Sequence, residues 1–99
     1  MTRRRWVVPD LPTFVDDEYN SRAIRAVLQH TGTQLLDEFR STTGHEREAV
    51  RERLRRFREE TLAGLIDGPH VPMGEAAAAA LRASAERIDL MVVTGLSEP

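Results

Sequence analysis

Apolar residues recur at helical spacing in three segments of the chain, and this pattern predicts an all-α fold. The clearest segment covers residues 43–68, where the core positions are spaced by four, three, four and four residues and so share one narrow helical face. These positions are Val50, Leu54, Phe57, Thr61 and Leu65. Thr43 and Glu46 have the spacing of a capping box at the start of this helix. Gly68-Pro69 is typical of a helix end.

A second helix is predicted over about residues 16–41, because the apolar positions keep their phase through Gly32. Its core face comprises Ile24, Val27, Leu28, Thr31, Leu35 and Phe39. A glycine inside a helix costs about 1 kcal/mol relative to alanine. Close approach of a neighbouring helix would explain Gly32, and a kink is the alternative. Leu36 points away from this face, so we expect it to be exposed or buried in a homodimer.

The third predicted helix begins between residues 72 and 75 and ends at Gly95. Its core face comprises Ala77, Leu81, Ala85, Ile88 and Val92. The stretch from Leu90 to Val93 is apolar on all sides. We expect it to be helical and to place Leu90, Met91 and Val93 in an interface. A short strand that pairs with residues 6–8 is the alternative.

Residues 1–15 are expected to form an extended arm, because Pro9 and Pro12 restrict themselves and the residues before them. Four apolar side chains of the arm are available to pack across the helices: Trp6, Val8, Leu11 and Phe14. The predicted architecture is therefore an up-down-up three-helix bundle over residues 16–95. The arm precedes the bundle, and a short tail, residues 96–99, follows it.

Composition limits the classes of function. The chain has 99 residues, 40% of them hydrophobic and 30% charged, and a net charge of −2, which suits one small globular domain without a broad affinity for nucleic acid. It contains no cysteine, which excludes disulfides and thiol chemistry. No apolar run of about 18 residues and no signal peptide are present, so we expect a cytoplasmic protein with no membrane partner. All 14 basic residues are arginine, which is typical of a GC-rich bacterium.

A row of arginines lies beside the apolar face of the segment 43–68: Arg47, Arg51, Arg55 and Arg58. One interpretation is that their stems cover the edge of the core while the guanidinium groups bind carboxylates of the next helix. The other is a docking strip for phosphate or an acidic partner. Charge runs on amphipathic helices are usually solvated, which favours the first interpretation.

No catalytic or metal-binding pattern emerges from the remaining polar residues. The run that begins at His45 starts like a zinc-protease helix but has Ala49 where the second histidine must stand. His30 lies off its core face, and His70 is in a proline loop. The serines lack the Gly-x-Ser-x-Gly setting of a nucleophile. We therefore expect no metal, no cofactor and no catalytic residue.

Three functional hypotheses remain, and the first is favoured. It is a non-enzymatic bacterial interaction or regulatory module that presents a helix face to a protein partner or to a second copy of itself. The second is a nucleic-acid-associated regulator that uses Arg3, Arg4, Arg5 and Trp6 with the arginine row. The third is a small enzyme or biosynthetic accessory protein with an arginine-lined pocket.

Overall fold

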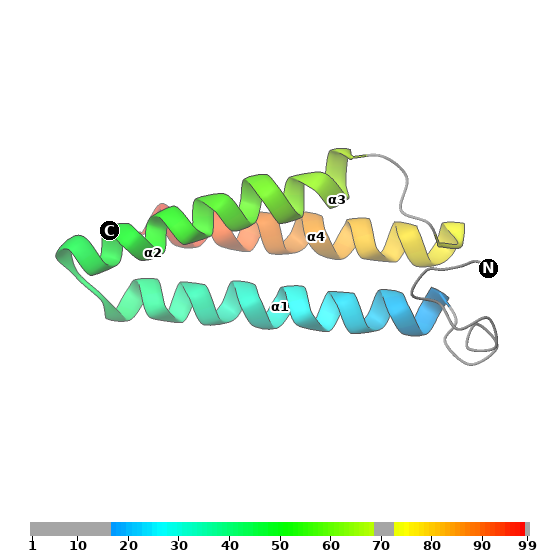
Figure 1. The fold of residues 1–99 in the computed structure, drawn as a ribbon, viewed down its shortest axis with the longest axis horizontal. Coiled ribbons are helices and arrows are strands. Elements are labelled where there is room, and N and C mark those ends of the chain that lie inside the picture. The colour runs from blue at the N-terminus through cyan, green and yellow to red at the C-terminus, as the bar shows by residue number, and fades with distance from the viewer. Residues whose placement is uncertain (1–16, 69–72, 99) are drawn as a thin grey trace, which may run out of the picture.

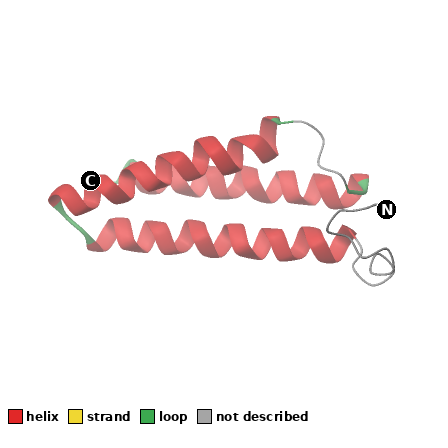
Figure 2. Ribbon diagram, viewed as in Figure 1, coloured by secondary structure: helices red, strands yellow, loops and turns green. Residues whose placement is uncertain are grey.

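The computed structural model describes residues 17–68 and 73–98, and every element in these ranges is helical (Figures 1 and 2). The elements are α1 (Asp17–Ser41), α2 (Gly44–Arg56), the π-helix η2 (Phe57–Leu62), α3 (Ala63–Asp67) and α4 (Glu75–Leu96). Because α2, η2 and α3 follow one another without a break, they form one helical segment. The prediction of an all-α chain with three packed helical segments is confirmed.

The three segments lie side by side (Figure 1). Helix α1 packs against both α2 and α4, whereas α3 and η2 pack against α4. Helix α3 is not among the elements that pack against α1. The α2–η2–α3 segment therefore starts close to the C-terminal end of α1 and diverges from its N-terminal half (Figure 1).

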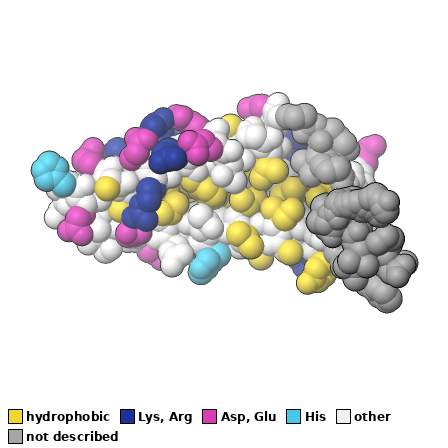
Figure 3. All heavy atoms as spheres, viewed as in Figure 1, with side chains coloured by type: hydrophobic (Ala, Val, Ile, Leu, Met, Phe, Trp, Pro, Cys, Tyr) yellow, Lys and Arg dark blue, Asp and Glu magenta, His cyan; other side chains and the backbone are white. Residues whose placement is uncertain are grey.

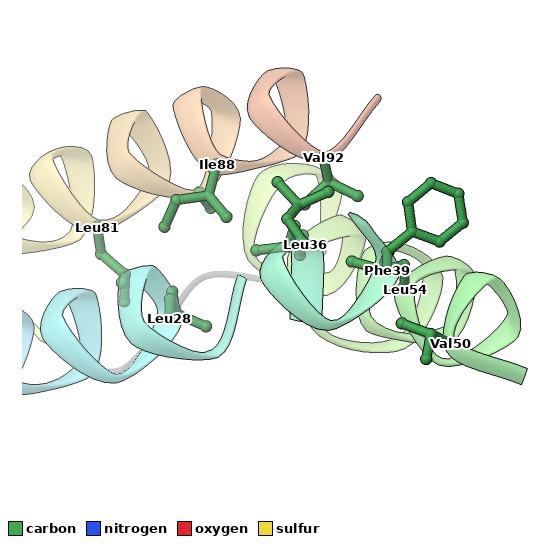
Figure 4. Close-up of a cluster of buried hydrophobic side chains, with 10 residues drawn as sticks. Leu28, Leu36, Phe39, Val50, Leu54, Leu81, Ile88 and Val92 are labelled. Carbon is green, nitrogen blue, oxygen red and sulfur yellow. The ribbon is translucent and has the colours of Figure 1, made fainter. Parts of the chain in front are cut away.

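Part of the core lies where α1 contacts both α2 and α4. Figure 4 shows Leu36 and Phe39 of α1 in one cluster of buried side chains with Leu54 of α2 and Val92 of α4. All four side chains are at most 2% exposed. The predicted core face of α4 is confirmed at all five positions, which are buried. Residues 90–93 belong to α4, so the alternative of a strand there is wrong.

The prediction for the core face of α1 is wrong in part. Ile24 is 37% and Val27 63% exposed, while Leu36, expected at the surface or in a homodimer, is 2% exposed. The reason is the contact with α4: a Cβ on Gly32 would lie 3.1 Å from Ile88 Cγ2. A Cβ on Gly95 would collide with the Leu36 side chain. Close approach at these glycines turns α1 toward α4, so the buried face includes Gly32 and Leu36.

The second segment is helical over nearly the predicted range, but a π-helical turn interrupts it. A π-helix advances more residues per turn than an α-helix. As a result Leu62 is fully buried, and Thr61, the predicted core position, is exposed. The capping box is also wrong, because Thr43 precedes the helix without a side-chain hydrogen bond to it. Gly44 begins the helix with φ of 59°, a conformation that favours glycine.

Candidate interaction surfaces

The first two arginines of the row lie over an aromatic ring of the core. The Arg47 guanidinium carbon is 4.0 Å and that of Arg51 is 5.0 Å from the centroid of Phe39. Cations over an aromatic face are attracted by its quadrupole. Phe39 itself is fully buried. These arginine side chains therefore cover the edge of the core at the junction of α1 and α2.

The other two arginines bind carboxylates of the same molecule. Arg55 forms ion pairs with Glu52 and Glu59 within its own segment. Arg58 Nε lies 2.7 Å from Asp89 Oδ1 of α4, and both side chains are about two-thirds buried. The hydrogen bond with Asp89 raises the pKa of Arg58, and the hydrogen bond from Arg55 lowers the pKa of Glu52. All four arginines thus already bind protein groups.

The three apolar residues predicted as an interface at the end of α4 differ in their surroundings. Leu90 is 66% exposed. Met91 lies on the α1 side, where its Cε would be 3.2 Å from a Cβ on Gly32 and its Sδ is 3.9 Å from Gln29 Nε2. Val93 is half-buried. Successive residues of a helix point about 100° apart, so Leu90 and Met91 point in different directions, whereas Val93 follows Leu90 by three residues and lies beside it.

A different apolar surface lies between α1 and α3. Glu38 forms an ion pair with Arg53 of α2, with 2.6 Å between its Oε2 and Arg53 Nη2. Val27 precedes Glu38 by 11 residues, about three helical turns, so it points to the same side of α1. Ile24 precedes Val27 by three residues and lies beside it. This side of α1 therefore faces the segment formed by α2, η2 and α3.

We call this surface the α1–α3 face. It comprises the exposed Ile24 and Val27 of α1, and the half-buried Leu65 belongs to the neighbouring α3. Figure 3 shows hydrophobic side chains gathered over the part of the molecule where α1 and α3 diverge, and charged side chains over the α2 part. The surface is thus an exposed apolar region on a diverging pair of helices.

The sequence pattern assigned Ile24 and Val27 to the core and so missed this surface. Gly32 could have indicated the buried side of α1. A glycine destabilises a helix, so its presence suggests that a neighbouring helix packs closely on that side. Leu28 and Leu36 lie on nearly the same side of the helix as Gly32, whereas Ile24 and Val27 lie farther around it. A core face centred on the glycine would have left both at its edge.

The described histidines do not assemble into a chemical site. His30 and His45 are both exposed on different helices. Within residues 17–68 and 73–98, no three His, Asp or Glu side chains are grouped as a metal site requires. None of the helices in those ranges is both long and apolar enough to cross a bilayer. His70 and the predicted nucleic-acid residues Arg3, Arg4, Arg5 and Trp6 lie outside the described residues.

Comparisons with protein families, with curated proteins and with solved structures find no match to this chain. The functional argument therefore depends on the surfaces of the molecule itself.

Proposed function

We propose that this protein is a small, non-enzymatic protein–protein interaction module that binds an apolar segment of its partner on the α1–α3 face. In this proposal the three segments act as an up-down-up bundle in the cytoplasm of a bacterium. The observation that carries the proposal is the exposure of Ile24 and Val27, 37% and 63%, on the side of α1 that faces the diverging α3. A helix or strand of a partner that inserts its apolar side chains there would complete the packing.

The size of the apolar surface indicates the strength of binding. Complete burial of one valine or isoleucine side chain contributes about 1.5–3 kcal/mol. A micromolar complex requires about 8 kcal/mol after the cost of association has been met. Ile24 and Val27 alone do not reach this value, so the partner must also cover Leu65 and contribute several anchors of its own. We expect a complex of moderate affinity.

The arginine row has a secondary role in the proposal. Arg47, Arg51 and Arg55 of α2 and Arg58 of η2 would orient an acidic partner and raise its rate of association. Their partner-binding role, like that of Leu90, Met91 and Val93, stays a prediction. The nucleic-acid and enzyme alternatives gain no support within the described ranges, because all four arginines of the row bind protein groups there.

Site-specific photo-crosslinking in cells of the source organism tests the proposal. A photoreactive amino acid is placed at Val27 in one full-length variant and at the exposed Glu86 of α4 in another. We expect the Val27 variant to yield one dominant crosslinked protein that the Glu86 variant does not yield. Mapping the crosslink on that protein should show an apolar segment. Identical products from both positions, or no product from Val27, would contradict the proposal.

A further inference from the structure

The start of α1 is fixed to the start of α4. A carboxylate oxygen of Asp17 accepts a hydrogen bond from the backbone N–H of Gly74, next to the first residue of α4. One turn later, the buried Ser21 hydroxyl donates to the carbonyl oxygen of Ala77 at 2.9 Å. Asp17, the first residue of α1, is therefore held against the start of α4, at the same end of the molecule as the α1–α3 face.

The distance from this point to the exposed apolar residues is short. Ile24 and Val27 follow Asp17 by seven and ten residues, so they lie about 10 and 15 Å along the helix. An extended chain spans about 3.3–3.6 Å per residue. If the preceding residues turn back along α1, Phe14 is within about 10 Å of Asp17 and Leu11 within about 20 Å. These two side chains bracket the positions of Ile24 and Val27.

The chemistry of the two surfaces is also complementary. Along α1, positions 20, 24, 27 and 31 share one side, and none of them is charged. The residues before Asp17 offer Phe14, Leu11, Val8 and Trp6. Pro9 and Pro12 limit the conformations of the unbound segment, which reduces the entropy lost on docking. The prolines also exclude a continuous fourth helix, so the docked segment is extended.

We propose that residues 1–16 cover the α1–α3 face of their own chain and that the partner must displace them. The displacement part depends on the proposed function; the docking part does not. A short tether gives the segment an effective concentration in the millimolar range. A second copy at micromolar concentration would have to compete with it, so the covalently attached segment is the favoured occupant. The segment then regulates the face by lowering the apparent affinity for the partner.

Trp6 is the only tryptophan of the chain, so its fluorescence reports whether the segment that contains it is held against the helices. The experiment compares three full-length proteins: the unaltered chain, Val27→Asp, and the control Ala26→Asp. Ala26 is an exposed residue on the same helix, about 100° around from Val27. Circular dichroism establishes that each variant retains its helical content; if Val27→Asp unfolds, Val27→Ser replaces it.

In the unaltered chain and in Ala26→Asp, we expect blue-shifted Trp6 emission and acrylamide quenching several-fold weaker than in the urea-unfolded protein. In Val27→Asp, the emission should shift to the red and the quenching should rise toward the unfolded value. Trp6 quenched as freely in the folded chain as in urea would overturn the proposal. So would equal quenching of Val27→Asp and Ala26→Asp.

Light scattering separates docking within one chain from docking between copies. We expect a monomer mass, with Trp6 emission that does not change with protein concentration. A dimer whose emission shifts to the red on dilution would overturn the proposal in favour of a second copy. A shielded Trp6 without a crosslinked partner at Val27 would refute the proposed function and leave the docking intact. A freely quenched Trp6 together with a crosslinked partner at Val27 would refute the docking and leave the proposed function intact.

Discussion

The part of the molecule around Phe39 and the part around Val27 are built from the same helical segments, but only the first is closed. Around Phe39, α1 meets both α2 and α4, and its ring is fully buried beneath Arg47 and Arg51. Around Val27, α1 meets α4 but does not pack against α3. The side chain there is 63% exposed. The difference shows that an amphipathic helix buries only as much of its apolar face as its neighbours cover.

Ion pairs between segments follow the same division. Arg53 binds Glu38, Arg58 binds Asp89, and Arg40 binds Glu98, all around the closed part. At the other end, α1 and α4 are linked by the Ser21–Ala77 hydrogen bond. Exposed ion pairs contribute about 0–1 kcal/mol each, so apolar packing rather than charge closes the molecule.

The largest expected effect comes from a core truncation in the closed part. Leu54 is fully buried, so Leu54→Ala should lower the free energy of unfolding by about 2–5 kcal/mol through lost burial and a cavity. Ile24→Ala in the other part should cost about 1 kcal/mol or less, because Ile24 is already 37% exposed. Urea unfolding followed by circular dichroism measures both. Equal losses would show that Ile24 is as well covered as Leu54 and would end the comparison.

Two helical glycines give an intermediate effect of opposite sign. A Cβ on Gly95 would collide with the buried Leu36, so Gly95→Ala should destabilise the protein by about 1–3 kcal/mol. A Cβ on Gly64 would meet nothing within 4 Å. Gly64→Ala should therefore stabilise by up to about 1 kcal/mol through helix propensity. Thermal unfolding of the two variants checks this pair. A stabilising Gly95→Ala would mean that α1 and α4 are less closely packed than described.

The smallest expected effect concerns the ion pairs. Arg58→Met removes a pair whose side chains are 35% and 28% exposed, and should cost about 1 kcal/mol. Arg56→Met removes a pair at 60% and 64% exposure and should change stability by less than about 0.5 kcal/mol. The pKa of Arg58 is raised in the folded protein, so the ion pair contributes its full stability at every pH below the ordinary arginine pKa. This contribution is lost only as the pH rises through the raised pKa. Urea titrations of both variants at neutral pH provide the comparison, and equal costs would contradict it.

The sequence by itself determined the helices and the identity of one core face. Spacing of apolar residues predicted all three segments and all five buried positions of α4, because helical periodicity is a local property of the chain. It also favoured the correct environment for Arg58, whose charge meets Asp89 on the next helix. The spacing of apolar residues predicts the buried face correctly where, as in α4, the most apolar side of the helix is also the side that its neighbours cover.

Only the tertiary structure decided which sides of α1 and η2 are buried. The approach of α4 to Gly32, and of Leu36 to Gly95, turned α1 away from the direction of its largest apolar residues. The π-helical turn moved Leu62 into the core in place of Thr61. Both outcomes depend on contacts between residues that are distant in the chain. The glycines and the π-helical turn allow close packing that the spacing of apolar residues does not predict. Ile24 and Val27 were left exposed for that reason.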